Sequence, residues 1–598
     1  MVDEIDASSG YDVKYMRMEL TIDPAVLYLS GNVNTTIEAR TDINEARMQL
    51  IRDFTIQSIK YQGQEVQFTH TDPFDLTILF PTTLTAGNTA EIEITYSGTP
   101  STAQGFGSVG IGQHEGVPVF WTLSEPYGAR DWWPGKNDLT DKIDSLDVIV
   151  HSPQAYRTAS NGLLISDTVI GTERTNHWKH RYPIVPYLVA VAVTNYAVYV
   201  DSAWSAGKFV PVVNYVYPED LEEIRPRTEN TPPLIDLYTE LFIPYPFSDE
   251  KYGHAQFGWG GGMEHQTMSF MGRFDFEIIA HELAHQWFGD MVTLNSWHDI
   301  WLNEGFATYL TGLAYEHMFD GFYWYRWKRL TLNFVTLLPG GSVYVADTAN
   351  VNRIFDSRLS YRKGALVLHS LRWIVGDTAF FDACKSYLTD PLAAYGFAST
   401  DMLKFYMETA SGKDLTEFFD DWYYGEGFPS YVLDVTSTED QKYNVSLSQT
   451  TSHPSVDFFE MPVPVTFYGP QFDTTIVFDH QQNGQSWVID IGFTPDSIVI
   501  DPEIWLITAN NQVLLDSSEP MPYPSASLHP NPAYDYVKVN FPYENPAYSI
   551  SDSKGNIIIA SRKFNPLEWI DVSQLRKGTY FIRLTSDKYS ATQKLIKL

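Results

Sequence analysis

The sequence of 598 residues contains a single cysteine, Cys384, so no disulfide within the chain can hold the fold together. No apolar run reaches about 18 residues, which excludes a transmembrane helix by the usual length criterion. Basic residues are also scarce, because 40 Lys and Arg stand against 74 Asp and Glu, a formal net charge of -34. Since phosphate contacts need clustered Lys and Arg, this balance argues against a nucleic acid or an anionic membrane as a partner, and no membrane insertion is expected.

The first residues, MVDEIDASSGYDV, have neither the basic region nor the apolar core of a signal peptide. We therefore expect either a cytoplasmic or periplasmic protein, or an exported protein whose signal has been removed. Hydrophobic residues make up 44% of the chain and charged residues 19%, an ordinary globular balance. At about 100–200 residues per domain, the length predicts several domains.

The hydrophobic pattern changes twice along the chain. Residues 11–200 contain segments such as AEIEITYSG and DSLDVIVHS, whose alternation and Val, Ile, Thr and Tyr content predict strands. From about 222 to 425 the apolar residues recur with helical period. Gly289, Gly376 and Gly412 stand where such helices could end, and Cys384 is predicted to be a core residue of one of them.

Short strands return after residue 428, and the last 70 residues are again β-like, with turns predicted at 553–555 and 577–578. The pattern as a whole predicts a multidomain α+β fold. The expected parts are an N-terminal β domain at 1–207, an α-rich domain at 208–428, a β-sandwich at 429–512, a Ser/Pro-rich linker at 513–528 and a C-terminal β domain at 529–598.

The strongest chemical signal is the motif His-Glu-Leu-Ala-His, which places His281 and His285 four residues apart. On a helix these positions lie on one face, so both imidazoles can reach one ion about 2 Å away. Glu282 lies off that line and can reach a metal-bound water without being a ligand. The flanking residues are apolar, which predicts a buried helix, with Asp275 as its N-cap. The alternative is a pair of surface histidines beside a charged neighbour.

A catalytic zinc site needs a third protein ligand, and Glu304 in the segment WLNEGFA is the candidate. It is separated from His285 by 18 residues, enough for a turn and an antiparallel second helix. The alternatives are a carboxylate placed to suit a helix N-terminus or a plain salt bridge. Asp299 is a weaker candidate, either to orient a ligand histidine or to cap a helix.

These residues resemble the gluzincin aminopeptidases of peptidase family M1, the family of aminopeptidase N and leukotriene hydrolase. Three further segments agree with that family. GGMEH at 261–265 resembles its G-x-M-E-N exopeptidase motif, EPYGAR at 125–130 resembles its E-P-x-x-A-R stretch, and SYRKGA at 360–365 resembles the segment that carries its catalytic tyrosine. The resemblance covers about residues 11–510 and implies a thermolysin-like catalytic domain with one Zn²⁺ per chain.

The resemblance also implies a role for each matching residue. Glu282 would be the general base and Tyr361 would donate its hydroxyl to the oxyanion. Glu264 and Glu125 would bind the free α-amine of a peptide substrate. The other substrate-binding residues that it implies are Gly261, Gly262, Met263 and His265, the glycines because they allow close backbone approach. The family usually has Asn where this chain has His265, which leaves the geometry of the substrate subsites open.

The C-terminal region has a resemblance of its own. HPNPA at 529–533, DSKG at 552–555, DVSQL at 571–575 and KGTY at 577–580 are similar to the C-terminal sorting domain of the type IX secretion system of Bacteroidetes. This implies export across the outer membrane, with the secretion machinery as a partner and a secreted or cell-surface location. The alternative is an ordinary small β-sandwich.

The sequence thus predicts a zinc aminopeptidase that hydrolyses the first peptide bond of peptides with a free N-terminus. A zinc endopeptidase with the same metal site is the first alternative, and it would require Glu264 and Glu125 to be structural. A non-catalytic surface binding protein with a structural zinc is the second. Epoxide hydrolysis, known from one branch of the family, is a third alternative that no residue specifically supports.

Overall fold

The computed structural model describes residues 10–71, 73–102, 106–137, 139, 141–438, 442–469, 472–516, 526–541, 545–552, 556–565, 569–586 and 590–598. The chain forms two compact units. The first runs to Phe428 and includes 452–457 and 504–507, and the second contains 429–451, 458–503 and 508–598. The turn predicted at 553–555 and residues 517–525 of the predicted linker lie outside the described residues.

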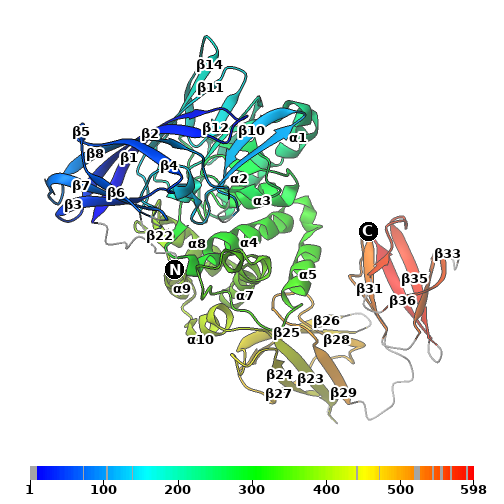
Figure 1. Cartoon of the computed structure of the whole chain (residues 1–598). Helices are drawn as coiled ribbons and strands as arrows, with labels where there is room; N and C mark the ends of the chain where they lie inside the picture. The colour runs from blue at the N-terminus through cyan, green and yellow to red at the C-terminus, as the bar shows by residue number, and fades with distance from the viewer. Residues whose placement is uncertain are drawn as a thin grey trace. The chain divides into compact units, whose positions relative to one another are not determined.

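The first part of unit 1 is built on an eight-stranded sheet (Figure 1, blue to cyan). Within it, the strand Tyr11–Ile22 pairs antiparallel with the strand Leu29–Ala39 on one side and parallel with the strand Leu146–Pro153 on the other. The order is β13 (Leu163–Ile170), β14 (Glu173–His180), β11 (Leu146–Pro153), β1 (Tyr11–Ile22), β2 (Leu29–Ala39), β8 (Thr89–Gly98), β4 (Phe54–Tyr61) and β5 (Gln64–Glu65). Every second residue of β2 is buried, as the predicted alternation requires.

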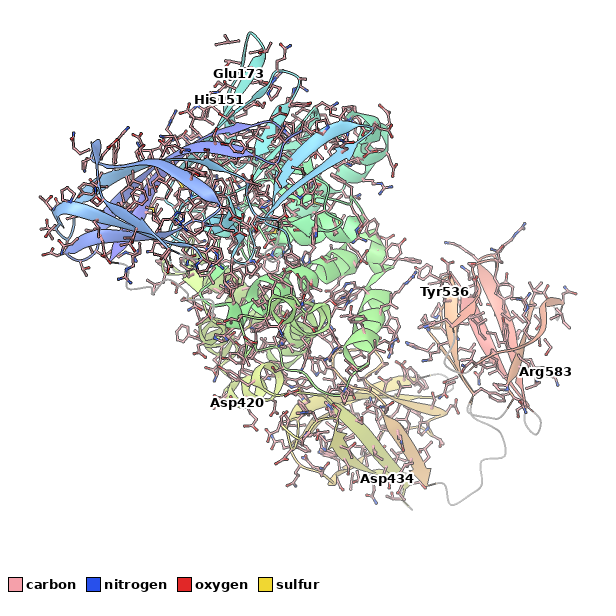
Figure 2. The ribbon with its side chains drawn as sticks, viewed as in Figure 1. His151, Glu173, Asp420, Asp434, Tyr536 and Arg583 are labelled. Atoms are coloured by element: carbon pink, nitrogen blue, oxygen red, sulfur yellow. The ribbon has the colours of Figure 1, made fainter. Side chains whose placement is uncertain are left out.

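Two neighbouring strands of this sheet carry the residues His151 and Glu173 that are labelled in Figure 2. The two side chains come from the paired strands β11 and β14, and His151 Nδ1 lies 3.2 Å from an Oε1 of Glu173. Two smaller sheets complete this region. They are β3 (Ile43–Gln49), β7 (Asp75–Leu84) and β6 (Phe68–His70), and β12 (Arg157–Ser160), β15 (Val191–Thr194), β10 (Val117–Thr122) and β9 (Val109–His114).

A five-stranded sheet connects the β region to the helical region within unit 1. Its order is β16 (Ala197–Ser205), β17 (Lys208–Val216), β18 (Tyr252–Gln256), β20 (Ser269–Met271) and β19 (Gly262–Met263). Because β16 and β17 form a hairpin, the sheet joins segments on both sides of the domain boundary expected at residue 207. The finer division into five parts stays a prediction.

The helices of unit 1 gather in the middle of the chain, as the helical period predicts (Figure 1, green to yellow). Gly376 and Gly412 follow the last residues of α7 and α9, and Gly412 takes the left-handed conformation of a helix C-cap, so both predicted ends are confirmed. The end predicted at Gly289 is wrong, because α3 stops at Ala284 and a further turn precedes the glycine. Cys384 lies buried in α8.

The bounds of the helices are α1 (Leu221–Thr228), α2 (Thr231–Leu241), α3 (Phe276–Ala284), α4 (Trp301–His317), α5 (Trp324–Val335), α6 (Val351–Ile354), α7 (Gly364–Val375), α8 (Asp377–Thr389), α9 (Thr400–Ser411) and α10 (Thr416–Phe419). A short parallel pair, β21 (Thr293–Leu294) and β22 (Phe397–Ala398), lies among them in the chain order. None of the helices in the described parts of the chain combines the length and apolar character that a membrane span requires.

Unit 2 is β-rich, which agrees with the predicted C-terminal sandwich region. Its first two sheets are β27 (Gln485–Ile489), β24 (Tyr443–Thr451), β23 (Pro429–Ser437) and β29 (Gln512–Asp516), and β26 (Asp473–His480), β25 (Met461–Tyr468) and β28 (Ser497–Ile500). The other two are β30 (Ser527–His529), β31 (Tyr536–Asn540) and β34 (Trp569–Asp571), and β33 (Ile557–Lys563), β32 (Ala547–Asp552), β35 (Gly578–Thr585) and β36 (Ser590–Lys597).

The last two sheets share a hydrophobic core of their own, which includes Val537, Ile550 and Ile582. The predicted multidomain α+β class is therefore confirmed, with an N-terminal β region, a helical middle and a β-rich C-terminal part.

Candidate metal centre and substrate cavity

The helix α3 carries the histidine motif and begins as predicted. The side chain of Asp275 accepts a hydrogen bond from the backbone N–H of Ile278, so the N-cap is confirmed. His281 lies in the last turn of α3, and His285 is the residue that caps its C-terminal end. The Nδ1 of His285 donates to the carbonyl oxygen of Phe288 at 3.2 Å, which turns its Nε2 toward His281.

Three donor atoms converge at this point. The Nε2 atoms of His281 and His285 lie 3.1 Å apart, and Oε2 of Glu304 lies 3.0 Å from the first and 3.3 Å from the second. Neighbouring ligands of a tetrahedral zinc with bonds of about 2.0–2.1 Å stand roughly 3.3–3.4 Å apart. The set of two imidazoles and one carboxylate therefore fits one zinc ion in both chemistry and spacing.

The charge of the surroundings also suits a cation. Burial lowers the pKa of His285, but the carboxylates of Glu264 and Glu304 outweigh that effect and raise the pKa to about 10. Four buried glutamates act on this region: burial raises the pKa of Glu125 and of Glu282, and the nearby carboxylates of Glu264 and Glu304 raise both further. Such an excess of negative charge in a dry site calls for a bound cation.

Glu304 reaches the histidines because α4 packs closely on the segment before α7. A Cβ atom placed on Gly305 would lie 3.2 Å from the Cα of Gly364, so the pair of glycines lets the two backbones approach. That contact also brings in the π-helical segment η6 (Ser357–Lys363), which holds Tyr361. The hydroxyl of Tyr361 donates to Oε1 of Glu304 at 2.8 Å, at the edge of the donor cluster.

Glu282 lies under the strand that carries the glycine motif. A Cβ atom on Gly262 would stand 2.3 Å from Oε1 of Glu282, so only glycine lets β19 cross the carboxylate so closely. The Oε2 atom of Glu282 is buried and has no hydrogen-bond partner among the described residues. Gly261 makes a similarly close approach to the ring of Trp259. The expected approach of both glycines to a substrate stays a proposal.

Glu264 and Glu125 come to the site from distant parts of the chain. Gln286, just after the histidine motif, donates to the carbonyl of Glu264 at 3.2 Å and accepts from the backbone N–H of Thr267 at 2.8 Å, which ties the Glu264 segment to α3. Glu125 follows β10 in the N-terminal β region. Both side chains are buried, and each has an Oε1 without a hydrogen-bond partner in the described structure.

These carboxylates and the donor cluster line one cavity of about 760 Å³. Met263 and Gly262 also line it, as expected of substrate-binding residues. Its walls also include aromatic side chains that sequence reasoning missed, because they lie outside any motif. Among them are Phe106, Trp259, which precedes the glycine motif, and Phe355, which precedes the tyrosine segment. Only the tertiary structure shows that these rings line the same cavity.

His265 and Asp299 are not among the described residues that line the cavity. The ring of His265 is fully buried and packs edge-on to Phe270, with centroids 4.4 Å apart. The substrate-binding role expected of His265 stays a proposal. Asp299 accepts hydrogen bonds from Thr400 on α9, at 2.6 Å, and from Tyr423 in the π-helical segment η7 (Asp420–Tyr424), so in the described structure these bonds link it to α9 and η7 and not to a ligand histidine.

Two family models match the chain. Residues 263–422 match the peptidase family M1 domain, and residues 527–598 match the secretion system C-terminal sorting domain. Similar curated proteins include aminopeptidase M1 of Arabidopsis thaliana, 28% identical over 371 residues, which are 58% of this chain and 41% of that protein. Leucyl aminopeptidase of Saccharolobus solfataricus is 26% identical over 366 residues, covering 55% and 44%. The chain thus spans less than half the length of these relatives.

Solved structures agree with this result. An M1 zinc metallopeptidase from Deinococcus radiodurans, solved as a mutant with a Tyr-Ser-Ala substrate, aligns with a TM-score of 0.62 and 27% identity, covering 70% of this chain and 94% of that one. Aminopeptidase A of Legionella pneumophila aligns with a TM-score of 0.70 at 17% identity, covering 86% and 60%, a likeness of fold. Residues 263–422 are therefore similar to the peptidase family M1 domain, and residues 527–598 are similar to a secretion system C-terminal sorting domain.

Proposed function

We propose that this protein is a zinc aminopeptidase that hydrolyses the first peptide bond of peptides with a free N-terminus. The observation that carries the proposal is the convergence of His281, His285 and Glu304 on one point beside the unpartnered carboxylate of Glu282. The aminopeptidase names of the curated relatives and the zinc metallopeptidase from Deinococcus radiodurans support it.

The three donor residues would hold one Zn²⁺, which when bound polarises a carbonyl and lowers the pKa of water. Glu282 takes a proton from the attacking water and passes it to the leaving amine. Burial raises the pKa of Glu282 and His285 lowers it, while Glu264 and Glu304 raise it further, so this carboxylate is a stronger base than one in water. Tyr361, already aimed at the donor cluster, donates its hydroxyl to the oxyanion.

Glu264 and Glu125 would make the site an exopeptidase. Two buried carboxylates with free oxygens form a binding site for the protonated α-amine of a peptide. Burial raises the pKa of Glu125, and the nearby Glu264 raises it again, so an ammonium group between the two relieves their repulsion. Because the amine is fixed, only the first peptide bond can reach Glu282.

Blocking the substrate's amine is expected to abolish hydrolysis. A peptide and its N-acetylated form differ only in the charge that Glu264 and Glu125 would bind, so kcat/KM for the blocked form should fall by roughly 10²-fold or more. The measurement compares product release from both peptides by chromatography. Equal cleavage of the two would favour the endopeptidase alternative, and zinc binding without any cleavage would favour the surface binding protein.

We also propose that residues 527–598 direct export, so that the protein is secreted or held at the cell surface. The support is the match of this region to a secretion system sorting domain and its separate hydrophobic core. Deletion of 527–598 from the full chain, expressed in a bacterium with type IX secretion, is expected to leave the protein inside the cell. Blots of medium and cell fractions check this, with peptidase activity of the lysate as the control. Undiminished export of the deleted chain would refute the assignment.

A further inference from the structure

Three aromatic side chains form a continuous wall on one side of the cavity. The ring of Phe106 lies 5.5 Å from that of Trp259 and 4.9 Å from that of Phe355, centroid to centroid. All three are half-buried, and all three line the cavity. They come from three segments far apart in the chain, so their packing is a product of the tertiary fold alone. We call these three residues the aromatic wall.

The aromatic wall lines the same cavity as Glu125 and Glu264, and it lies beside the glycine motif, because a Cβ atom on Gly261 would stand 2.0 Å from the ring of Trp259. Two more apolar residues that line the cavity are close to the carboxylates in sequence. Leu123 lies two residues before Glu125, and Met263 directly precedes Glu264. Leu123 and Met263 are almost fully buried, at 2% and 3% exposure. The α-amine and the side chain of a peptide's first residue leave the same Cα atom. A substrate held by its amine therefore places its first side chain against Leu123, Met263 and the aromatic wall.

Charge and shape define what this region accepts. Among the described lining residues of the segments 106–125 and 259–264, together with Phe355, the charged ones are Glu125 and Glu264. Both are engaged by the amine in the proposed function. A substrate carboxylate here would meet their repulsion, and a short side chain would leave the aromatic wall uncovered. An apolar side chain long enough to cover the rings would remove that surface from water.

We infer that this site selects peptides whose first residue has a large apolar or aromatic side chain, such as Phe, Tyr, Leu or Met. The inference rests on the proposed aminopeptidase function and specifies its substrate class. Burial of such a side chain relative to alanine corresponds to a preference of roughly 10- to 100-fold.

The experiment measures kcat/KM of the zinc-loaded full chain on aminoacyl-coumarin substrates that differ only in the amino acid. Phe and Leu are expected to exceed Ala, Arg and Glu by roughly tenfold or more. A preference for Arg, which aromatic faces can also hold, or equal rates for Ala and Phe would overturn the inference while leaving an aminopeptidase. Hydrolysis of none of them would overturn the proposed function and the preference with it.

Variants of the aromatic wall test whether it sets the preference for the first residue of the substrate. Phe106→Ala is expected to lower the Phe-to-Ala ratio of kcat/KM by roughly tenfold, and Phe106→Leu to keep most of it. Phe106→Glu should raise the Arg-to-Phe ratio, because it adds a carboxylate beside the pocket. Phe334→Ala is the matched control, since this ring lines the same cavity from α5, packed on Arg362, and its loss should leave the ratio unchanged. An unchanged ratio in all Phe106 variants, with normal thermal melting, would show that the wall is not the pocket.

Discussion

Removal of the metal with a chelator is expected to lower peptide hydrolysis by the full chain by roughly 10³-fold or more, with recovery when zinc is added. The physical reason lies in the four buried glutamates around the donor cluster, whose negative charge a bound cation offsets. Without the ion, nothing polarises the substrate carbonyl, and the pKa of His285 rises to about 10, so its imidazole becomes cationic and is no longer a ligand. Activity and metal content, measured on the same dialysed samples, check this.

Variants of the donor residues distinguish the proposed site from adventitious zinc. His281→Ala and Glu304→Ala should each lose both bound zinc and activity, because a tetrahedral site with two protein ligands binds far more weakly. His151→Ala is the matched control: this histidine pairs with Glu173 on the β11–β14 pair, labelled in Figure 2. It should keep full activity and one zinc per chain. Retention of zinc and turnover by the Glu304 variant would contradict the ligand assignment.

Glu282→Gln is expected to reduce kcat by roughly 10²- to 10⁴-fold while the protein keeps its zinc. The amide has nearly the shape of the carboxylate, so it preserves the packing under Gly262, but it cannot accept a proton. Steady-state kinetics and elemental analysis of the variant check both halves of this result. Glu240→Gln, an exposed carboxylate on α2, is the control for the substitution itself. Near-normal turnover in Glu282→Gln would mean that another group acts as the base.

The same carboxylate predicts the acid side of the pH profile. Burial raises the pKa of Glu282, His285 lowers it, and Glu264 and Glu304 raise it beyond the ordinary value of 4.5. The base acts only when deprotonated, so activity should fall as pH falls through this raised pKa. The acid limb of kcat/KM is therefore expected above pH 4.5. Residual activity of Glu282→Gln should lack that limb, and an identical limb in the variant would assign the titration to another group.

The sequence predicted the local parts of the site well, because they depend on short spacings. Positions i and i+4 of a helix share a face in any fold, so the partnership of His281 and His285 needed no tertiary information. The N-cap at Asp275 and the helix end at Gly412 are equally local. The predicted end at Gly289 is wrong because α3 ends at Ala284, and local backbone hydrogen bonds from Gln286 to Leu283 and from Trp287 to Ala284 form a further turn before the glycine.

The roles expected of Glu125, Glu264 and Tyr361 came from likeness to a family, since nothing in their own neighbourhoods distinguishes them from surface residues. The structure brings all three to the donor cluster, and their exact functions stay proposals. His265 shows the limit of that route. The motif match implied a contact with substrate, whereas its ring is fully buried against Phe270 and is not among the described residues that line the cavity.

By itself, the sequence determined that this chain has separate β and helical regions, no disulfide framework, and a helix able to present two imidazoles to one ion. The tertiary structure alone decided which carboxylates lie around the proposed metal site and which rings line the cavity. The reason is physical: hydrophobic period and helix geometry act over a few residues, whereas Phe106, Trp259 and Phe355 meet through contacts spanning up to 249 positions of the chain, which leave no periodic trace in it.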